Sequence, residues 1–544
     1  MSDAQSKPTN THATDFDLIV IGGGINGAGI ARDAAMRGMR VCLFEQADLC
    51  NSTSRWSSRL IHGGLRYLEH AEFSLVYESL HERERLLRNA PHLVRPLELL
   101  IPIFKGGRRG RFVVGCGMWL YDLLSLGKSL PRHRMLSAEE ALDTLPLLNS
   151  SNLVGAATYF DAQVTFAERL VVENALAARD AGATIHTYSR VDQVLTHDGV
   201  VRGVRFTDLR NDCQRDVSAK TVVNATGPWV DFLLGKLPKR VRKFMGGTKG
   251  THIVVDAFPG HPKTGCYIEA KSDGRPFFVI PWNGMLLIGT TDIRHEGSPA
   301  AAGAGEDEIR YLLDETNRVF PSADLAEKDI HFHYTGVRPL PRKSKGSTGA
   351  ITRRHLLRHH RRAAKGLYSA IGGKLTTYRN FAEQITDRVA RRIGFRGEKC
   401  STRRTPLPGG IGDYRDTVDA LDQCNAIRPE SRAHLLRVYG SRALQILELV
   451  DEQPRLGETI CPHSHMIAAE VVFCLRFELA TTISDVLLRR SMAGLSRDLG
   501  RTALPRAISV ARKHLGWSQQ RADGEERRYL REIERMHVPA KAIE

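Results

Sequence analysis

The first regular unit of the chain is marked by short apolar runs that alternate with glycine and small residues. Asp17–Gly22 is a continuous apolar run after its first residue, which is typical of a strand buried on both faces. Small residues then predict a helix over Asn26–Arg37, with Gly38 where that helix should end. Arg40–Phe44 has the pattern of a second buried strand, closed by Glu45. Together these elements predict one βαβ unit within about 30 residues.

Two later apolar segments have the pattern of further strands of the same sheet. Lys220–Trp229 runs from an apolar strand into a glycine-containing turn. Gly366–Lys374 is a strand that ends in two glycines, and a helix is expected after it over Thr376–Ile393. We therefore expect both segments to extend the parallel sheet.

The pattern between these two segments changes to a period of two residues. Phe277–Thr290 predicts two antiparallel strands joined by the Asn283–Gly284 turn. An antiparallel domain is thus inserted into a parallel one. After Leu407–Gly410 the apolar spacing becomes helical. The expected helical segments of this tail are Leu435–Val450, Met466–Leu479 and Ile483–Met492.

A chain of 544 residues is too long for one simple core, so two or three domains are expected. The fold class is α/β: a Rossmann-like parallel-sheet domain, an inserted antiparallel-sheet domain and a C-terminal helical domain. The hydrophobic content of 42% and the charged content of 26% are ordinary for a globular protein and argue against a disordered chain.

The net charge of +17 leaves three classes of partner open: nucleic acid, an anionic membrane surface and an acidic small substrate. The absence of zinc-finger, basic-zipper or RNA-binding patterns disfavours nucleic acid. The basic residues also fit solvated loops. Their clusters are Lys105–Arg111, Lys236–Lys243, Arg342–Lys345 and Arg353–Arg362.

Cysteine usage and hydropathy restrict the cellular setting. The nine cysteines form no C-x-x-C pair, which argues against a disulfide scaffold, a zinc site and an iron–sulfur cluster, so no metal is expected. Met1–Asp15 is polar and has no signal-peptide character. Phe112–Leu126 is the longest apolar stretch, and it is too short to span a bilayer. We expect a cytoplasmic protein, or one bound peripherally to a membrane.

The strand-to-helix turn of the first unit carries the clearest chemical signal. Gly22, Gly24 and Gly27 match G-x-G-x-x-G, in which the glycines permit a tight turn, close approach of a pyrophosphate and close helix–strand packing. The helix N-terminus directs free N–H groups at the phosphates. Glu45 stands about 20 residues further on, where a carboxylate binds a ribose 2′-OH. The pattern predicts dinucleotide binding but does not separate NAD from FAD.

Several ordered blocks beyond this turn resemble the aerobic, FAD-dependent glycerol-3-phosphate dehydrogenase family. The resemblance covers about Asp15 to Gly410, and the tail with Asp485–Arg490 is similar to the C-terminal domain of that family. The blocks are Ser52–Leu68, Val223–Trp229, Lys249–Val254, Phe278–Trp282, Ile288–Asp292, Tyr334–Pro339 and Gly372–Arg379. The resemblance implies a discontinuous FAD-binding domain (15–75, 150–235 and 335–395), a substrate domain (76–149 and 236–334) and a helical domain (396–544).

The resemblance also implies a reaction and its partners. FAD would oxidise sn-glycerol 3-phosphate to dihydroxyacetone phosphate, with hydride passing from C2 to flavin N5 and electrons passing on to a membrane quinone. The implied location is the cytoplasmic face of the inner membrane, on an anionic surface, and we also expect a homodimer. Alternatives are an oxidase that uses oxygen and an amine or hydroxy-acid oxidase of the same flavin superfamily. A non-enzymatic FAD-binding regulator is the alternative from another class.

Substrate-binding residues are assigned by matching this sequence to the blocks of that family. A phosphate dianion needs fixed cationic donors, for which Arg66, Arg338 and Lys374 are the candidates, with Tyr67 and Tyr378 as hydroxyl donors. Arg338 and Lys374 also stand as catalytic candidates. Lys374 could equally serve the flavin, since a cation near N1 and C2=O stabilises its reduced anion.

The proton acceptor and the remaining cofactor contacts are also candidates at this stage. His62 and His252 are both considered as the base, because the pKa of histidine lies near working pH, and the sequence does not rank them. The predicted cofactor-binding residues are Gly22, Gly24, Gly27, Glu45, Ser57, Ser58, Thr226, Gly227, Gly372, Gly373 and Lys374.

Two segments raise separate questions. The apolar and aromatic run from Arg111 to Leu124 follows a basic cluster, so it could lie in the headgroup layer of a membrane or form an ordinary buried helix. Asp161–Arg169 departs from the compact Asp-Asp/Asn-Ala-Arg run that family members tend to carry. The effect of that departure is left open.

Overall fold

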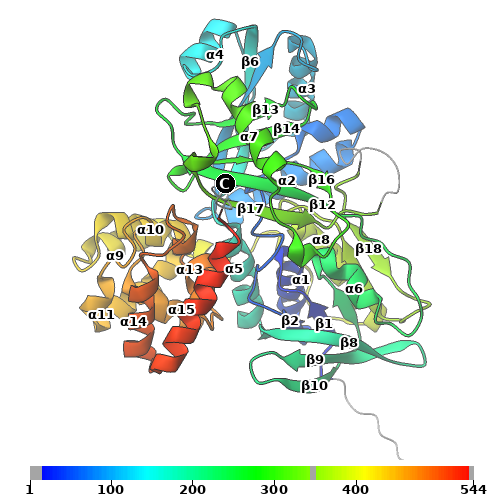
Figure 1. Ribbon diagram of the computed structural model, residues 1–544. Coiled ribbons are helices and arrows are strands. Elements are labelled where there is room, and N and C mark those ends of the chain that lie inside the picture. Colours follow the sequence, from blue (N-terminus) through cyan, green and yellow to red (C-terminus); the bar gives the residue numbers. More distant parts are fainter. Residues whose placement is uncertain (1–14, 343–350, 538–544) are drawn as a thin grey trace, which may run out of the picture.

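The computed structural model describes residues 15–342 and 351–537, which form three packed parts (Figure 1). The polar residues 1–14 and the Lys343–Lys345 portion of one basic cluster lie outside the described residues. In Figure 1 a parallel-sheet part lies below, a larger mostly antiparallel sheet lies above, and a helical part stands at one side. This arrangement confirms the predicted fold class.

The parallel sheet has six strands, and β1 (Leu18–Ile21) lies inside it. All neighbouring strands pair in parallel except the edge strand β18. The predicted strands of the first unit and the two later segments therefore share one sheet. In spatial order the strands are β18 (Leu356–His359), β19 (Leu367–Ile371), β11 (Val222–Asn224), β1, β2 (Val41–Phe44) and β7 (Thr184–His186).

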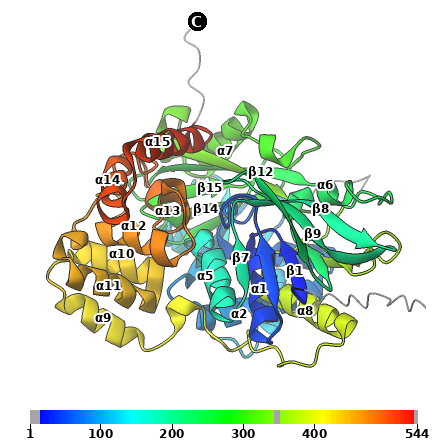
Figure 2. The same cartoon turned by 90° about the horizontal axis from the view of Figure 1, so that it is seen from below.

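Both faces of this sheet are covered, which explains its continuous apolar strands. One face carries α1 (Ile25–Met36), flanked by α5 (Ala167–Asp180) and α8 (Tyr378–Ile393). The alanines and glycines of α1 allow this close approach. The other face packs against a three-stranded antiparallel sheet, seen at the right of Figure 2. Its strands are β8 (Ser189–His197), β9 (Val200–Asp208) and β10 (Cys213–Ser218), and the short helix α6 (Val230–Leu234) adjoins them.

The larger sheet has ten strands and includes the predicted hairpin. β14 (Pro276–Trp282) and β15 (Met285–Gly289) pair antiparallel across Asn283 and Gly284, which both have positive φ, as a tight hairpin turn requires. The other strands are β3 (Leu60–Ile61), β4 (Val94–Phe104), β5 (Arg134–Leu136), β6 (Leu153–Val164), β12 (Thr248–Asp256), β13 (Gly265–Glu269), β16 (Ile293–Arg294) and β17 (Ile330–Arg338).

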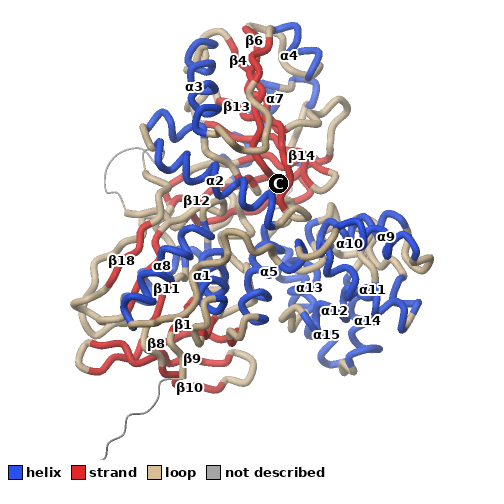
Figure 3. The backbone as a smooth tube through the Cα atoms, turned by 180° about the vertical axis from the view of Figure 1, so that it is seen from behind, coloured by secondary structure: helices blue, strands red, loops and turns tan. Residues whose placement is uncertain are grey.

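One domain boundary differs from the prediction. Strand β6 lies within the range 150–235 assigned to the FAD-binding domain, but it pairs along its length with β4 of the larger sheet. After β6 the chain returns to the parallel-sheet part with α5. Helices cover both sides of the larger sheet (Figure 3). They are α2 (Phe73–Asn89), α3 (Arg111–Leu124), α4 (Ala138–Thr144) and α7 (Glu306–Val319).

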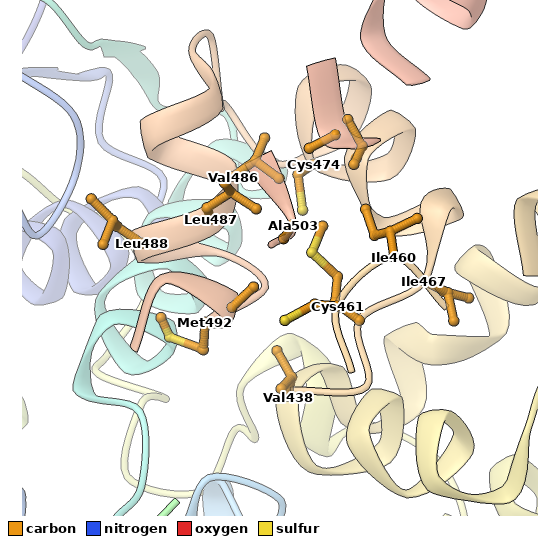
Figure 4. Packing of buried hydrophobic residues seen from close by; sticks show 14 of the residues in the cluster. Val438, Ile460, Cys461, Ile467, Cys474, Val486, Leu487, Leu488, Met492 and Ala503 are labelled. Carbon is orange, nitrogen blue, oxygen red and sulfur yellow. The ribbon is translucent and has the colours of Figure 1, made fainter. Parts of the chain in front are cut away.

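The C-terminal part is helical, as predicted, and has its own apolar core (Figure 4). The expected helix over Leu435–Val450 is wrong as a single element, because it breaks at Gly440 (φ 57°, ψ −133°). A Cβ at that glycine would overlap the carbonyl oxygen of Gly409. The helices are α9 (Tyr414–Gln423), α10 (Pro429–Tyr439), α11 (Ala443–Glu452), α12 (Ala468–Phe477), α13 (Ile483–Arg489), α14 (Leu504–Leu515) and α15 (Gln519–Glu534).

Hydropathy and cysteine state complete the description. Across residues 15–342 and 351–537, none of the helices combines the length and apolar character needed to cross a bilayer. All nine cysteines are free thiols.

Candidate functional site

The carboxyl ends of the parallel strands open into a cavity of about 870 Å³, which we call the glycine-rich cavity. This is the edge of an α/β sheet where ligands bind. Nine of the eleven predicted cofactor residues line it: Gly22, Gly24, Glu45, Ser57, Thr226, Gly227, Gly372, Gly373 and Lys374. Gly27 and Ser58 do not line it.

The turn between β1 and α1 has the backbone geometry that its glycines predicted. Gly22 has φ +110°, and a Cβ there would stand 2.6 Å from the carbonyl oxygen of Ala225. A Cβ on Gly27 would overlap the carbonyl oxygen of Gly22, so Gly27 acts by packing rather than by lining the cavity. The first turn of α1 contains no acidic residue, and Gly24 has no side-chain cap. This N-terminus therefore fits a phosphate group.

Glu45 lies at the cavity wall and is already held by backbone groups. Its Oε2 accepts a hydrogen bond from the N–H of Gly23 (2.7 Å), and its Oε1 accepts one from Ala47 (3.0 Å). Burial raises the pKa of this carboxyl above its usual value. The side chain thus fixes the turn as well as facing the cavity.

The loop after β2 is fastened on both sides of the cavity. Ser54 Oγ accepts a hydrogen bond from the N–H of Ile25 at the start of α1 (3.0 Å). On the other side, Thr53 Oγ1 donates to the carbonyl of Val337 (2.8 Å), and the Tyr334 hydroxyl donates to that of Ser57 (2.9 Å). The loop therefore joins the glycine turn to strand β17.

The C-terminal helical part forms one wall of the same cavity, which the sequence did not predict. Arg531, Glu532, Arg535 and Met536 from the end of α15 line it. Glu532 accepts hydrogen bonds from Arg55 (3.2 Å) and from Arg489 (2.6 Å), the latter within the Asp485–Arg490 run. In the sequence, this wall was indicated only by the resemblance of the Asp485–Arg490 run to the C-terminal domain of the family.

A second cavity of about 400 Å³ adjoins the first, and we call it the arginine-rich cavity. The two cavities share four lining residues: Thr53, Trp56, Ser57 and Gly336. Seven residues predicted for substrate, base or cofactor line it: Ser57, Ser58, His62, Arg66, Tyr67, His252 and Arg338. These side chains come from the segment after β2, from β12 and from β17, so folding brings three distant segments together.

Arg338 is held in a fixed orientation at the end of β17. Its Nη1 donates to Asp292 Oδ1 (3.1 Å), and its Nη2 donates to Thr290 Oγ1 and to the carbonyl of Thr291, both at 3.0 Å. Arg353 also donates to Asp292, at 3.3 Å. The arginines beside it hold the pKa of the Asp292 carboxyl below its usual value, although burial opposes them.

Arg275 and Arg353 also line the arginine-rich cavity, and sequence reasoning missed both. Arg353 belongs to the basic cluster Arg353–Arg362, which also fitted a solvated loop, and Arg275 lies just before the predicted hairpin. With Arg66 and Arg338 they place four guanidinium groups around one small cavity. Such a cavity suits a small anion with several oxygens.

Lys374 stands at the boundary between the two cavities. Its Nζ donates to Ser79 Oγ (3.0 Å) and to the carbonyl of His62 (3.3 Å), and it lies 4.6 Å from the ring centre of Tyr67. Burial lowers the pKa of Lys374 to about 7. Its charge therefore changes within the physiological range.

His252 is buried and His62 is half-buried, and loss of solvent contact holds the pKa of each ring well below the ordinary value. His252 Nε2 lies 2.9 Å from Ser58 Oγ, and the ring stacks on Tyr334 at 4.9 Å. Among the described residues its Nδ1 has no hydrogen-bond partner. The backbone N–H of His62 donates to Thr376 Oγ1 (3.1 Å). Loss of solvent contact therefore favours the neutral form of both rings.

Tyr378 was predicted to bind the substrate, but it lines neither cavity. It is buried between helices, where its hydroxyl accepts a hydrogen bond from Asn174 Nδ2 (2.9 Å) and its ring packs on Gly29. It lies only four residues beyond Lys374, but the start of α8 directs it toward α1 and α5.

The divergent stretch at Asp161–Arg169 supplies buried ion pairs rather than ligand contacts. Asp161 pairs with Arg83 (2.6 Å), Glu168 with Arg59 (2.7 Å), and Arg169 with Glu478 of the helical part (2.5 Å). The Asp161–Arg83 pair lies within the larger-sheet part, whereas the other two pairs link α5 to the segment before β3 and to the helical part.

Comparisons with known proteins identify the family of this chain. Residues 17–380 match the family model of FAD dependent oxidoreductases, and residues 400–522 match the C-terminal domain of alpha-glycerophosphate oxidase. The chain is 44% identical to a glycerol-3-phosphate dehydrogenase of Synechocystis, over 97% of this chain and 98% of that protein. It is 33% identical to an aerobic glycerol-3-phosphate dehydrogenase of Staphylococcus saprophyticus, over 88% and 86%.

One solved structure is similar over nearly the whole chain, and another over about three quarters of it. The structure of a glycerol-3-phosphate dehydrogenase from Bacillus halodurans, complexed with FAD, is 28% identical, with a TM-score of 0.78 over 98% of this chain and 97% of that one. An L-alpha-glycerophosphate oxidase from Mycoplasma pneumoniae, at 19% identity and a TM-score of 0.55, covers 72% of this chain and shares the fold alone.

Proposed function

This chain belongs to the family of FAD-dependent glycerol-3-phosphate dehydrogenases, and on that basis we propose that it oxidises sn-glycerol 3-phosphate to dihydroxyacetone phosphate and passes the electrons to a membrane quinone. The observation that carries the proposal is the arginine-rich cavity beside the glycine-rich one. A small phosphorylated alcohol fits the arginine-rich cavity, and a dinucleotide fits the glycine-rich cavity.

The charged side chains of the arginine-rich cavity bind and orient the substrate. Arg338, held by Asp292 and Thr290, places a fixed positive charge at the wall of this cavity, where it attracts the phosphate. Arg66 and Arg353 add positive charge from other segments. Lys374 and Tyr67 adjoin them where the two cavities meet. FAD, when bound in the glycine-rich cavity, supplies the two-electron acceptor for the hydrogen on C2.

A neutral histidine accepts the proton of the C2 hydroxyl. His252 has a buried Nδ1 without a partner among the described residues, and His62 lies beside Lys374, so both remain candidates. Replacing each by Gln and measuring the reductive half-reaction decides between them. General-base catalysis contributes about 10²–10⁴-fold, so loss of the base should slow the reaction by that order. An unchanged rate removes that histidine from the role.

The absorption spectrum of the purified protein tests the central proposal. We expect a yellow protein whose flavin band bleaches when sn-glycerol 3-phosphate is added without oxygen. Glycerol and glycine serve as controls, because the first lacks the anion and the second is the substrate of an amine oxidase. A flavin that bleaches with glycine but not with glycerol 3-phosphate would contradict the proposed substrate.

An exposed apolar patch supports the membrane part of the proposal. On α3, Phe112 is 83% exposed and Trp119 is 68% exposed. The ring centre of the exposed Tyr77 of α2 lies 5.5 Å from Nζ of Lys128, which follows α3. We call these exposed residues the α2–α3 patch: Phe73, Tyr77, Phe112, Val113, Trp119, Leu123 and Leu126. The exposed cations Lys105 and Arg108 flank it, as expected of a surface that enters anionic headgroups.

Vesicle binding and acceptor choice test this part separately. The double variant Phe112→Ser/Trp119→Ser should bind phosphatidylglycerol vesicles at least about ten-fold more weakly, because two large apolar side chains no longer enter the bilayer. Ile411→Ser, at an exposed apolar residue of the helical part, should bind as the wild type does. Turnover with a soluble quinone and little peroxide supports the dehydrogenase. Rapid peroxide formation would favour the oxidase. The homodimer stays a prediction.

A further inference from the structure

Helix α3 has two faces with different surroundings. One face carries the exposed Phe112 and Trp119 of the α2–α3 patch. The opposite face carries Val114, Met118 and Tyr121, which pack into the apolar cluster beneath the larger sheet. Tyr121 is 2% exposed. In Figure 1 the helix lies at the upper end of the molecule, beside β6. One helix therefore connects the surface patch with the interior.

The hydroxyl of Tyr121 both donates and accepts a hydrogen bond in the interior. It donates to the Asp161 carboxylate, whose two oxygens both lie at 2.8 Å, and it accepts a hydrogen bond from the backbone N–H of Gly63 (3.0 Å). Arg83 fixes the same carboxylate at 2.6 Å. A hydroxyl that donates once and accepts once in a buried, charge-assisted network defines the position of each partner closely.

Gly63 belongs to the turn that presents the substrate-side residues. It stands between His62 and Gly64, which both line the arginine-rich cavity. A Cβ at position 63 would overlap the Tyr121 hydroxyl, so the turn and the helix are in direct contact. The carbonyl groups of His62 and Gly63 are also acceptors for Lys374 Nζ. The Gly63 N–H also donates to Asp161 Oδ1 (3.2 Å), so Tyr121 and Asp161 together hold the peptide that positions the backbone of one candidate base and the amine of Lys374.

A second contact leads from Tyr121 to the same cavity. Its ring meets that of Tyr159 edge to face, at a centroid distance of 5.7 Å and an angle of 83°. Tyr159 also lines the arginine-rich cavity. A small shift of α3 would thus reach two walls of that cavity through one side chain, because tightly packed interiors transmit displacement.

We infer that Tyr121 is a positioning residue that couples the α2–α3 patch to the His62–Gly64 turn, so that docking of the patch on a lipid surface adjusts the arginine-rich cavity. The coupling rests on the membrane contact proposed above. The positioning role rests only on the contacts of Tyr121 with Gly63, Asp161 and Tyr159. Asp161, at the start of the divergent stretch, has its role here as the acceptor that orients the hydroxyl.

The variant Tyr121→Phe removes the hydroxyl and keeps the ring. We expect the reductive half-reaction to slow by about ten-fold while FAD content stays close to that of the wild type; Tm should fall, because a buried hydrogen bond to a charged group is lost. The pH dependence of that rate should also shift, because the carbonyls beside Lys374 are no longer fixed. Tyr414→Phe, at an exposed tyrosine of the helical part, should match the wild type. If Tyr121→Phe fails to fold, Gly63→Ala disturbs the same contact from the turn and should show the same loss.

Phosphatidylglycerol vesicles separate positioning from coupling. We expect them to raise kcat of the wild type several-fold and to leave kcat of Tyr121→Phe nearly unchanged, although both proteins bind the vesicles equally. A Tyr121→Phe enzyme with the rate and pH profile of the wild type overturns the positioning role. Equal stimulation of both proteins, or binding without stimulation of the wild type, overturns the coupling. A wild type that does not bind vesicles overturns the membrane contact itself and the coupling with it, while the half-reaction still decides the positioning role.

Discussion

The two adjoining cavities are built by different means. The glycine-rich cavity is shaped by backbone: Gly22, Gly24 and Gly372 line it, and the N-terminus of α1 faces it. The arginine-rich cavity is shaped by side chains, among them Arg338 and Arg353. A pyrophosphate can be bound by N–H groups of one short turn, whereas a small free anion needs charged groups that converge from several segments. Substitutions should therefore act on different properties in the two cavities.

The largest effect is expected from Gly27→Ala. The added Cβ would overlap the carbonyl oxygen of Gly22, so the turn must open and the phosphate site is lost. We expect purified protein without bound flavin, measured as the ratio of the flavin band to the protein band. Gly524→Ala in α15 is the control, because a Cβ there meets no atom within 4 Å. Full flavin content in Gly27→Ala would contradict the backbone description of this cavity.

The next effect is expected in the arginine-rich cavity. Arg338→Met removes charge-assisted hydrogen bonds worth about 1.5–3 kcal/mol each, so KM for sn-glycerol 3-phosphate should rise by about 10- to 100-fold. FAD content should not change. Arg338→Lys should recover only part of the loss, because an ammonium lacks the planar fork of a guanidinium. Arg310→Met, at an exposed residue of α7, is the control. Loss of flavin from Arg338→Met would contradict the assignment of substrate binding and FAD binding to different cavities.

The same difference explains which parts of the site could be predicted from sequence. The Gly22–Gly27 turn and the Asn283–Gly284 hairpin have conformations set by neighbouring residues, so a local pattern is sufficient. Arg353 and the α15 wall depend on packing between segments far apart in the chain. Without a structure, Arg353 could not be distinguished from the solvated cations around it.

Two further differences have local causes that sequence periodicity alone does not resolve. Tyr378 follows Lys374 by four residues, and one turn of chain is enough to direct it into the α1–α5 interface. The apolar spacing of Leu435–Val450 continues through Gly440, where the backbone leaves the helical conformation. Gly440 itself indicates a helix end, but the apolar spacing on both sides of it predicts a continuous helix.

The pH dependence of kcat/KM should reveal the cation at the boundary between the cavities. Because the pKa of Lys374 is about 7, its ammonium is present below that pH and is lost as pH rises through it. If phosphate binding needs the ammonium, kcat/KM should fall by about ten-fold per pH unit above pH 7, since this ratio reports the free enzyme. Lys374→Arg should remove that descending limb, because a guanidinium stays charged. A limb that persists in Lys374→Arg would assign it to another group.

The smallest effects should come from two serines only four residues apart. One serves the glycine-rich cavity and the other the arginine-rich cavity, so they test the difference between the cavities within one loop. Ser54 Oγ accepts from the first N–H of α1, whereas Ser58 Oγ lies 2.9 Å from His252 Nε2. Removing a cap-type hydrogen bond costs about 1 kcal/mol, so Ser54→Ala should weaken FAD binding about five-fold and leave KM unchanged. Ser58→Ala should leave FAD binding unchanged and slow the reductive half-reaction by a similar factor. Flavin titration of the apoprotein and anaerobic stopped-flow measure the two effects. If both variants changed both quantities, the loop between the cavities would act as one unit, and the division into a backbone-built and a side-chain-built cavity would fail there.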